Sequence, residues 1–329
     1  MTPLDVIGIG NAIVDLIAPA NDAFLGRMGI EKGIMQLVGA ARAEALHAAM
    51  AAPIQAPGGS VANTMAGLGA LGLACAFVGR VADDALGRFY AGAMEAQGTA
   101  FPNPPAAGAA LPTSRSMIFV SPDGERSMNT NLAESTALTA ADLPRAALGA
   151  ARLLFLEGYL FDTPANKAAF LHAAELTRAG GGRVGIALSD PFCVDRHRAD
   201  FRALVAGPMD YVIGNAREWL SLYETDDLDA ALDRAAAECP LVACTRSGDS
   251  VLLRAGAERA EVPVRRVVPV DATGAGDQFA AGFLWGLARG APLEACGRMG
   301  CVAAAEVIGH VGPRPDADLL ALMAAEGLA

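Results

Sequence analysis

The chain has 329 residues, of which 53% are hydrophobic, and its formal net charge at pH 7 is −11. This length can bury a sizeable core, and the apolar composition is unlike that of a disordered chain. An acidic surface repels nucleic-acid phosphates and anionic lipids, so these are not expected partners, whereas a small anionic ligand needs only a local pocket.

The N-terminal segment MTPLDVIGIG contains an acid and no basic stretch, unlike a secretory signal. The longest apolar stretch, 65–78, is too short to cross a bilayer. The six cysteines include no C-x-x-C pair and have no histidine at zinc-ligand spacing. We therefore expect a cytoplasmic protein with buried, reduced thiols.

Short apolar runs alternate with helical patterns along the chain. Strands are predicted at 5–10, 73–79, 152–158, 183–189, 211–215 and 241–245. Helices are predicted at 60–71, 84–97, 163–179, 194–205, 216–222, 228–237, 276–289, 293–308 and 316–326. This alternation predicts an α/β fold with a mostly parallel sheet sandwiched by helices.

Two regions interrupt the alternation. Residues 31–38 read as a strand, and 115–131 read as a hairpin with Pro-Asp-Gly in its turn. Strands inserted into an α/β layout usually form a separate small sheet. We therefore predict a β-rich lid subdomain at 13–52 and 99–134, and a large domain made of 1–12, 53–98 and 135–329.

The segment DATGAGD (271–277) follows a strand-like RRVVPV (265–270) and precedes a helix. Gly274 and Gly276 allow successive N–H groups to point at one spot at a helix N-terminus, which is an anion-binding arrangement. Taken alone, Asp277 is better explained as an acid in the first helical turn that favours the helix dipole. Phosphoryl transfer to an alcohol, however, needs both N–H donors and a nearby base.

Two N-terminal segments carry polar groups suited to a polyol. GIGNAIVD (8–15) lacks the third glycine of a dinucleotide fingerprint, so an NAD-linked oxidoreductase is rejected. Its Asn11 and Asp15 are better explained as contacts to hydroxyl groups. In GGSVAN (58–63) the glycines Gly58 and Gly59 allow close approach to a ligand, and Asn63 lies one turn into the helix. Ser60 is better explained as a helix cap than as a contact.

DATGAGDQFAAGF resembles the C-terminal signature of the ribokinase-like PfkB family of sugar and nucleoside kinases, and GNAIVD and GGSVAN follow the family's order of motifs. The resemblance implies that Asp277 is the catalytic base and that the amides of Gly274, Ala275 and Gly276 form the anion hole. It implies that Asp271 and Thr273 brace the loop or help to hold a monovalent cation such as K⁺. Ala272 departs from the usual Thr or Asn.

Two further segments resemble the nucleotide side of the family. GNARE (214–218) is similar to its N-x-x-E motif, which implies that Asn215 and Glu218 act on Mg²⁺ and the phosphates of ATP through water. The alternative is an Asn helix cap followed by an exposed Glu. CTRSGDS (244–250) is similar to the segment that crosses ATP, which implies contacts from Thr245 and Gly248.

Several segments resemble the adenosine kinase branch: GNAIVD, ERSMNTNLAES (125–135), FLEGYLF (155–161), ALSDPF (187–192) and DYVIGN (210–215). The resemblance implies that Arg126 approaches the phosphates and that Met128, Thr130 and Tyr159 lie near the base.

We expect ATP-dependent phosphoryl transfer to the 5′-hydroxyl of a ribonucleoside, adenosine first, by a monomer or homodimer. The alternatives are another nucleoside or a free sugar as acceptor, and a non-catalytic nucleoside-binding protein. Fructose, ribose and a keto-deoxy acid are the sugars considered, and the last would call for a basic pocket residue, for which the sequence offers only Arg126.

Overall fold

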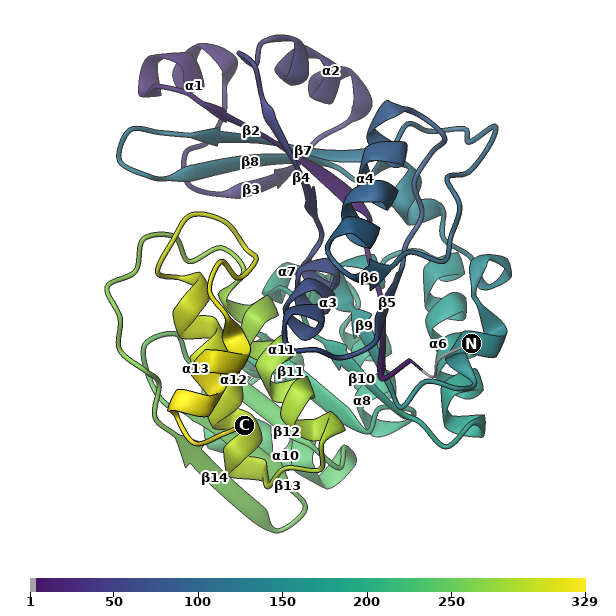
Figure 1. The fold of residues 1–329 in the computed structure, drawn as a ribbon, viewed down its shortest axis with the longest axis vertical. Coiled ribbons are helices and arrows are strands. Elements are labelled where there is room, and N and C mark those ends of the chain that lie inside the picture. The colour runs from purple at the N-terminus through teal and green to yellow at the C-terminus, as the bar shows by residue number, and fades with distance from the viewer. Residues whose placement is uncertain (1–3) are drawn as a thin grey trace.

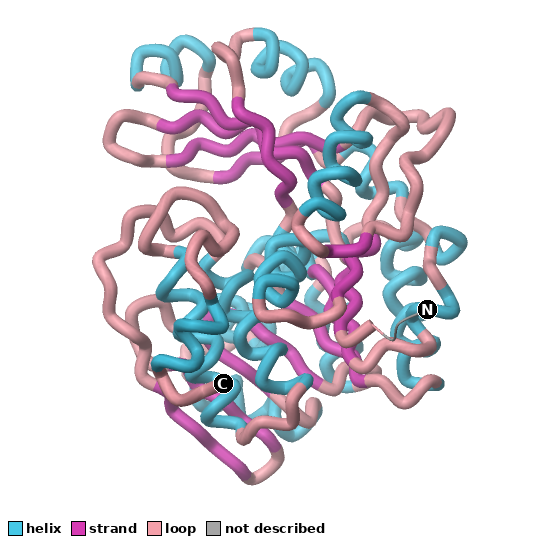
Figure 2. Tube along the Cα trace, in the orientation of Figure 1, coloured by secondary structure: helices cyan, strands magenta, loops and turns pink. Residues whose placement is uncertain are grey.

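The computed structural model describes residues 4–329, so residues 1–3 of the predicted large domain lie outside it. The described chain folds into a nine-stranded sheet and a separate five-stranded sheet (Figures 1 and 2). The predicted fold class, a mostly parallel sheet sandwiched by helices with a small β-rich unit beside it, is confirmed.

The larger sheet has the order β14-β13-β12-β11-β10-β9-β1-β5-β6. Its strands are β1 (Val6–Ile9), β5 (Cys75–Val78), β6 (Thr99–Ala100), β9 (Leu153–Glu157), β10 (Arg183–Ala187), β11 (Tyr211–Asn215), β12 (Val242–Thr245), β13 (Val251–Ala255) and β14 (Glu258–Val262). The neighbouring strands β12, β11, β10, β9, β1, β5 and β6 all run parallel, and β13 and β14 add an antiparallel edge. Because parallel strands end at one edge, β1, β9, β10, β11 and β12 deliver their last residues to the same side, where ligands collect in open α/β sheets.

The smaller sheet has the order β3-β8-β7-β2-β4. Its strands are β2 (Ile13–Pro19), β3 (Met35–Leu37), β4 (Ile54–Gly58), β7 (Ser114–Val120) and β8 (Arg126–Asn131). The predicted strand at 31–38 and hairpin at 115–131 correspond to β3 and β7–β8. Helices α1 (Asp22–Met28) and α2 (Ala40–Ala48) cover the face turned away from the larger sheet (Figure 1).

The division of the chain into a lid and a large domain stays a proposal. Strand pairing shifts two of its predicted boundaries, because β4 pairs with β2 in the smaller sheet and β6 pairs with β5 in the larger one. We therefore propose that the lid includes residues 53–58 and begins again after residue 100.

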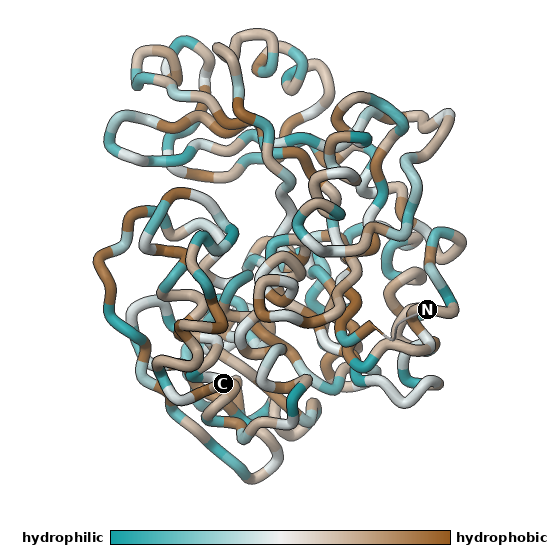
Figure 3. The backbone as a smooth tube through the Cα atoms, in the orientation of Figure 1, coloured by the Kyte–Doolittle hydropathy of each residue, from teal (hydrophilic) through white to brown (hydrophobic). Residues whose placement is uncertain are grey.

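Helices cover both faces of the larger sheet, and side chains of alternating strand residues enter two separate cores. One face carries α3 (Ser60–Ala70), α4 (Ala85–Ala96), α11 (Ala275–Ala288), α12 (Leu293–Val307) and α13 (Leu319–Ala325). The other carries α5 (Arg145–Leu148), α6 (Pro164–Ala179), α7 (Pro191–Arg196), α8 (Arg198–Ala206), α9 (Ala216–Tyr223) and α10 (Leu228–Glu238). Three short 3₁₀ helices join elements, namely η1 (Ala133–Ala137), η2 (Ala140–Asp142) and η3 (Gly158–Leu160). Figure 3 shows apolar stretches along the strands that these helices enclose.

The packing of α11 fixes the start of this helix, which carries the predicted catalytic loop. At Gly282 an added Cβ would lie 2.3 Å from the carbonyl oxygen of Met299, so only glycine lets α12 approach this closely. Gln278, in the first turns of α11, donates to the carbonyl of Asn63 at 3.0 Å and so ties α11 to α3.

Two local predictions are wrong. Residues 265–270 are not a strand: no described strand pairs with them, and the side chain of Val268 is 86% exposed. The predicted helix at 194–205 is two helices, because His197 ends α7 and begins α8 with non-helical backbone angles. Within residues 4–329, no helix combines the length and apolarity needed to cross a membrane.

Candidate active site

A cavity of about 700 Å³ lies where the smaller sheet faces the carboxyl ends of the larger one. The predicted site residues that line it are Asn11, Asp15, Gly59, Asn63, Met128, Thr130, Tyr159, Thr273, Gly274, Ala275, Gly276 and Asp277. Five segments far apart in the sequence therefore converge on one cavity, as the predicted acceptor site requires. Asn215, Glu218, Thr245 and Gly248 are not part of this lining.

Asp277 lies in the first turn of α11, against the first turn of α3. Ser60 Oγ donates to Asp277 Oδ1 at 2.6 Å, and Asn63 Nδ2 donates to Oδ2 at 2.9 Å. Thr64 Oγ1 donates to the Asp277 carbonyl at 3.1 Å. Burial raises the pKa of Asp277 to about 6, against the lowering effect of these side-chain donors. A carboxylate with this pKa is ionised near neutral pH and can accept a proton, which suits a general base.

The structure corrects the predicted role of Ser60 as a helix cap. The helix cap is Gly59, without a side-chain hydrogen bond, and Ser60 is the first residue of α3. Its hydroxyl donates to Asp277, so it belongs to the site. The sequence reading missed it because capping is the commoner role for Ser at a helix start.

The N-terminus of α11 presents free amides next to Asp277. Within residues 4–329, the N–H groups of Gly274 and Gly276 donate to no other residue, whereas that of Ala275 donates to the Ala272 carbonyl at 3.3 Å. Unpaired N–H groups and the helix dipole together favour an anion here. The predicted hole is therefore geometrically supported at two of its three members, with Ala275 engaged in the turn.

Gly274 has a conformation that only glycine adopts without strain. It lies in the left-handed region at φ 80°, and an added Cβ would lie 2.5 Å from Pro313 Cα. An added Cβ at Gly276 would meet nothing within 4 Å, so this position opens toward the cavity. The two glycines are therefore needed for different reasons: Gly274 permits the turn, and Gly276 leaves room for a ligand.

Arg126 of β8 and Asp271 of the loop before α11 form a buried ion pair, with Arg126 Nη1 2.7 Å from Asp271 Oδ2 and side chains only 7% and 10% exposed. Asp271 also accepts from Thr273 and from the amide of Gly312 at 3.0 Å. Burial alone would raise the pKa of Asp271, but these hydrogen bonds lower it overall. The geometry supports the bracing role of Asp271, while the K⁺ site at Asp271 and Thr273 stays a proposal.

We expect the Arg126–Asp271 pair to be strongly coupled in stability. Removing one member leaves a buried charge unpaired, so Arg126→Gln should lower the free energy of unfolding by about 3 kcal/mol. The double variant with Asp271→Asn should lose less than the sum of the two single losses. Urea unfolding measures this, with Lys32→Gln, from an exposed pair, as the control expected to cost about 0.5 kcal/mol or less. Additive losses would contradict the coupling.

Arg126 keeps hydrogen-bond donors that a ligand could use. Its Nε and Nη2 atoms are buried and have no hydrogen-bond partner among the described residues. In this structure, however, its guanidinium is bound to Asp271 and does not line the cavity. Its approach to the phosphates therefore remains a proposal that requires a rearrangement when the nucleotide binds.

Asp15 lines the cavity from β2, and its carboxyl group makes no hydrogen bond to another described residue. A Cβ added at Gly58 would lie 2.6 Å from its carboxyl atoms, so the carboxylate rests directly on the glycine backbone. Burial raises the pKa of Asp15 to about 7, opposed by the charges of Arg126 and Arg314. A buried carboxyl group without protein partners is suited to accept hydrogen bonds from ligand hydroxyls.

The side chain of Asn11 is hydrogen-bonded to other residues of the protein. Its backbone amide and Nδ2 donate to Glu157 Oε1 at 3.1 and 2.8 Å, and its Oδ1 accepts from Ser135 Oγ at 2.8 Å. Glu157 Oε2 in turn accepts from the amide of Val61 at 3.0 Å, and burial raises the pKa of Glu157 to about 7. The sequence reading had Glu157 only as the end of a strand, and tertiary contact alone reveals its place under the site.

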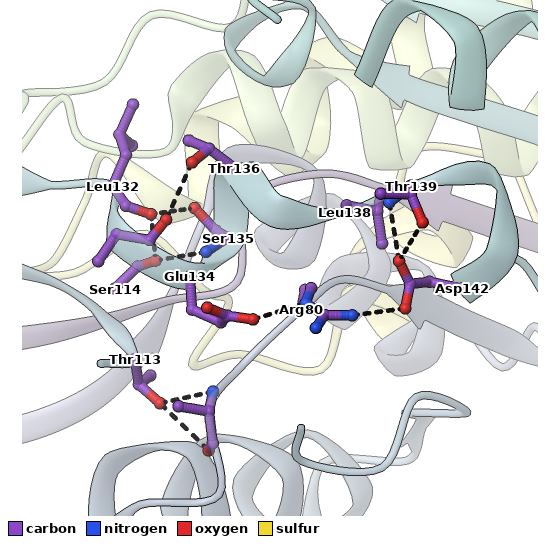
Figure 4. A network of polar contacts seen from close by, with 12 residues as sticks. Arg80, Thr113, Ser114, Leu132, Glu134, Ser135, Thr136, Leu138, Thr139 and Asp142 are labelled. Atoms are coloured by element: carbon purple, nitrogen blue, oxygen red, sulfur yellow. Dashed lines mark hydrogen bonds and ion pairs between the residues drawn. The ribbon is translucent and has the colours of Figure 1, made fainter. Parts of the chain in front are cut away.

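An ionic network holds the junction between the sheets next to Asn11. Arg80 lies between Glu134 and Asp142, with a nitrogen–oxygen distance of 2.6 Å to each (Figure 4). Glu134 belongs to η1, which follows β8 directly and also contains Ser135. The network therefore fixes the segment through which the smaller sheet joins the larger domain.

Part of the cavity lining is apolar. Met128, Thr130 and Tyr159 line the cavity as predicted for a base pocket. The sequence analysis missed Met35 and Leu37 of β3, which line the cavity from the smaller sheet, and Phe192 of α7, a residue that is 76% exposed. Large apolar side chains left exposed around one space indicate a ligand surface.

The predicted nucleotide residues end strands β11 and β12, where Asn215 pairs with Thr245. Asn215 caps α9 by accepting from the Glu218 amide at 3.0 Å, and Glu218 Oε2 accepts from the Asn215 amide at 2.8 Å. The helix-cap alternative is therefore present, but Glu218 is buried instead of exposed, and burial raises its pKa to about 8. Gly248 lies in the turn after β12.

A divalent cation would not find a complete protein site here. Over residues 4–329, no group of three or more His, Cys, Asp or Glu side chains could hold a metal. Mg²⁺ is commonly bound by one or two carboxylates together with nucleotide phosphates and water. The buried carboxyl group of Glu218 fits that mode, and its role toward Mg²⁺ stays a proposal.

Residues 32–319 match the family described as pfkB family carbohydrate kinase. The chain belongs to this family. A crystal structure of a probable sugar kinase protein from Rhizobium etli CFN 42 is 44% identical, with a TM-score of 0.92 and 100% of both chains covered. The crystal structure of adenosine kinase from Sinorhizobium meliloti is also 44% identical over 100% of both chains, with a TM-score of 0.90. The 5-dehydro-2-deoxygluconokinase of Photobacterium profundum is 28% identical over 317 residues, which cover 92% of this chain and 88% of the relative.

The predicted family resemblance is thereby confirmed, and the protein is a PfkB-type kinase that binds a small-molecule acceptor. Kinases of this family use ATP with a divalent cation. The relatives bear different acceptor names, so the acceptor of this PfkB kinase has to be argued from its cavity.

Proposed function

We propose that this PfkB kinase transfers the γ-phosphoryl group of ATP to the 5′-hydroxyl of a ribonucleoside, adenosine before others. One observation carries the proposal: a single cavity is lined both by the carboxyl groups of Asp15 and Asp277 and by exposed apolar side chains from β3 and α7. A nucleoside has a matching polar ribose and flat base. A free sugar would leave these apolar side chains in contact with water. The 44% identical Sinorhizobium meliloti structure described as adenosine kinase supports this acceptor.

In the proposed mechanism, Asp15 accepts hydrogen bonds from the ribose diol and so orients the attacking oxygen. Asp277, held by Ser60 and Asn63, takes the proton of the 5′-hydroxyl. ATP with its divalent cation supplies the phosphoryl group. The free amides at the start of α11 stabilise the charge that develops on that group. Approach of the smaller sheet would exclude water from the cavity.

The acceptor is tested by measuring ADP release with adenosine, inosine, cytidine, ribose, fructose and 5-dehydro-2-deoxygluconate. The expected result is turnover of a nucleoside with kcat/KM at least about tenfold above every free sugar, since base burial adds more than about 1.4 kcal/mol. Turnover of a free sugar with every nucleoside silent would overturn the assignment.

Phe192→Ala should separate the two kinds of acceptor. The ring is exposed to the cavity, so its loss should raise the KM for the nucleoside about tenfold, as expected for losing one aromatic stacking contact. Any residual turnover of ribose should be unchanged. Leu171→Ala, an exposed apolar residue of α6 that does not line the cavity, is the matched control. Equal effects of Phe192→Ala on nucleoside and ribose would contradict a base contact.

A sugar acid is the second candidate, favoured by the match to a 5-dehydro-2-deoxygluconokinase. A carboxylate would need a cation, and the cavity wall includes Arg196, which lies 3.4 Å from Asp162. Arg196 is thus already paired, and the negative groups Asp190 and Asp195 line the same wall. This charge balance favours a neutral acceptor.

A further inference from the structure

Arg314 lies in the segment between α12 and α13, which no sequence motif marked as part of the site. Two hydrogen bonds fix this segment against the catalytic loop. The Gly312 amide donates to Asp271 Oδ2 at 3.0 Å, and Gln278 Nε2 donates to the Pro313 carbonyl at 3.0 Å. Arg314 is therefore held beside the start of α11.

The guanidinium of Arg314 has only neutral partners. Its Nε donates to Asn63 Oδ1 at 3.1 Å, its Nη1 donates to Gln97 Oε1, and its Nη2 lies 3.6 Å from Met94 Sδ. Among residues 4–329 it makes no ion pair, unlike Arg126, whose charge is paired with Asp271. The site thus has a second, half-buried cation, whose charge no described carboxylate neutralises by direct contact.

Arg314 decides which way the Asn63 amide faces. A guanidinium can only donate, so the atom of Asn63 that it contacts has to be the oxygen. The amide nitrogen then faces Asp277 Oδ2, at 2.9 Å. The ionised Asp277 carboxylate favours the same orientation because it can only accept, so Arg314 and Asp277 hold the Asn63 amide from its two ends.

The charges around Asp277 come from several elements. Asp15 on β2, Glu157 on β9 and Tyr159 on η3 each bring a titratable group whose pKa is affected by Asp277. Burial raises the pKa of both Asp15 and Asp277, and at both the charge of Arg314 opposes that rise. Two carboxyl groups, Asp15 and Asp277, therefore lie within electrostatic reach of Arg314, as does the hydroxyl group of Tyr90.

We propose that Arg314 is a positioning residue for phosphoryl transfer, which locks the Asn63 amide so that it donates to Asp277. Its positive charge also opposes protonation of Asp15 and Asp277. This inference rests on the proposed role of Asp277 as the base.

The test compares Arg314→Gln and Arg314→Lys by the pH dependence of kcat/KM, with whichever acceptor the panel identifies. Arg314→Gln should move the acid limb upward by about one pH unit and lower kcat at pH 7 about tenfold or more. The acceptor KM should change less than about threefold, since Arg314 does not line the cavity. Arg314→Lys, which keeps the charge, should return the limb to within about 0.3 units of the wild-type position.

Arg298→Gln is the matched control, because Arg298 is an exposed arginine of α12 whose side chain makes its only hydrogen bond among the described residues to the Glu326 carbonyl. It should leave both the limb and kcat unchanged. Melting temperatures of all variants identify any loss that is caused by unfolding.

An unchanged acid limb in a folded Arg314→Gln protein would overturn the inference, as would an equal shift in the Lys and Gln variants. Asp277→Asn distinguishes a failure of the base assignment from a failure of the role proposed for Arg314. If Asp277→Asn keeps wild-type turnover, the base assignment itself fails. If Asp277→Asn is inactive and Arg314→Gln behaves as wild type, only the role of Arg314 fails.

Discussion

Asp277→Asn should lower kcat by about 10³-fold while acceptor binding changes by less than about threefold, because only the proton-accepting group is lost. In the wild-type protein kcat/KM should fall as the pH drops below about 6, where burial places the pKa of Asp277. Steady-state rates across pH, together with calorimetric titration of the nucleoside, measure both effects. A variant that retains near-wild-type turnover would show that another group takes the proton.

The same substitution should stabilise the protein at alkaline pH. The folded-state pKa of Asp277 is raised from 3.8 to about 6, so the contribution of this carboxyl to stability is greatest below pH 3.8 and is lost as the pH rises through 6. Asn carries no charge and avoids that loss. The melting temperature of Asp277→Asn should therefore exceed that of the wild type by a few degrees at pH 8 and by less at pH 4. A gain that does not depend on pH would rule out burial of the charge as its cause.

Gly274→Ala should lower kcat by about 10²-fold, since it displaces the amides that face the transferred group. The added Cβ would lie 2.5 Å from Pro313 Cα, and the φ of 80° is strained for alanine. Rates at saturating ATP and acceptor measure the loss.

Gly290→Ala provides the control for strain alone. Gly290 follows the opposite end of α11 with a φ of 70°, and an added Cβ there would meet nothing within 4 Å. Both variants should lose roughly 1–2 kcal/mol of stability from the left-handed conformation, but only Gly274→Ala should lose activity. Equal activity losses would contradict the proposed role of the loop at 274–276.

Local sequence patterns were sufficient for much of the fold, because strands and helices differ in how their apolar residues repeat. The predicted strand at 152–158 corresponds to β9, and the hairpin at 115–131 corresponds to β7–β8. The strand predicted at 265–270 is absent, because a local pattern alone does not make a strand. The valines of this segment have the composition of a strand, but a strand exists only where a neighbour supplies hydrogen bonds, and none is present in the described chain.

Short contiguous motifs were enough to predict the family, the α/β class and the grouping of Asp277 with two glycines, since each of these features is encoded within a few neighbouring residues. The partners of the site residues became visible only in the folded chain: Ser60 and Asn63 hold Asp277, Arg126 pairs with Asp271, and Arg314 contacts Asn63 from the C-terminal segment. These partners lie up to 251 residues apart. Their meeting depends on how the helices pack and how chain segments cross, which no local pattern encodes.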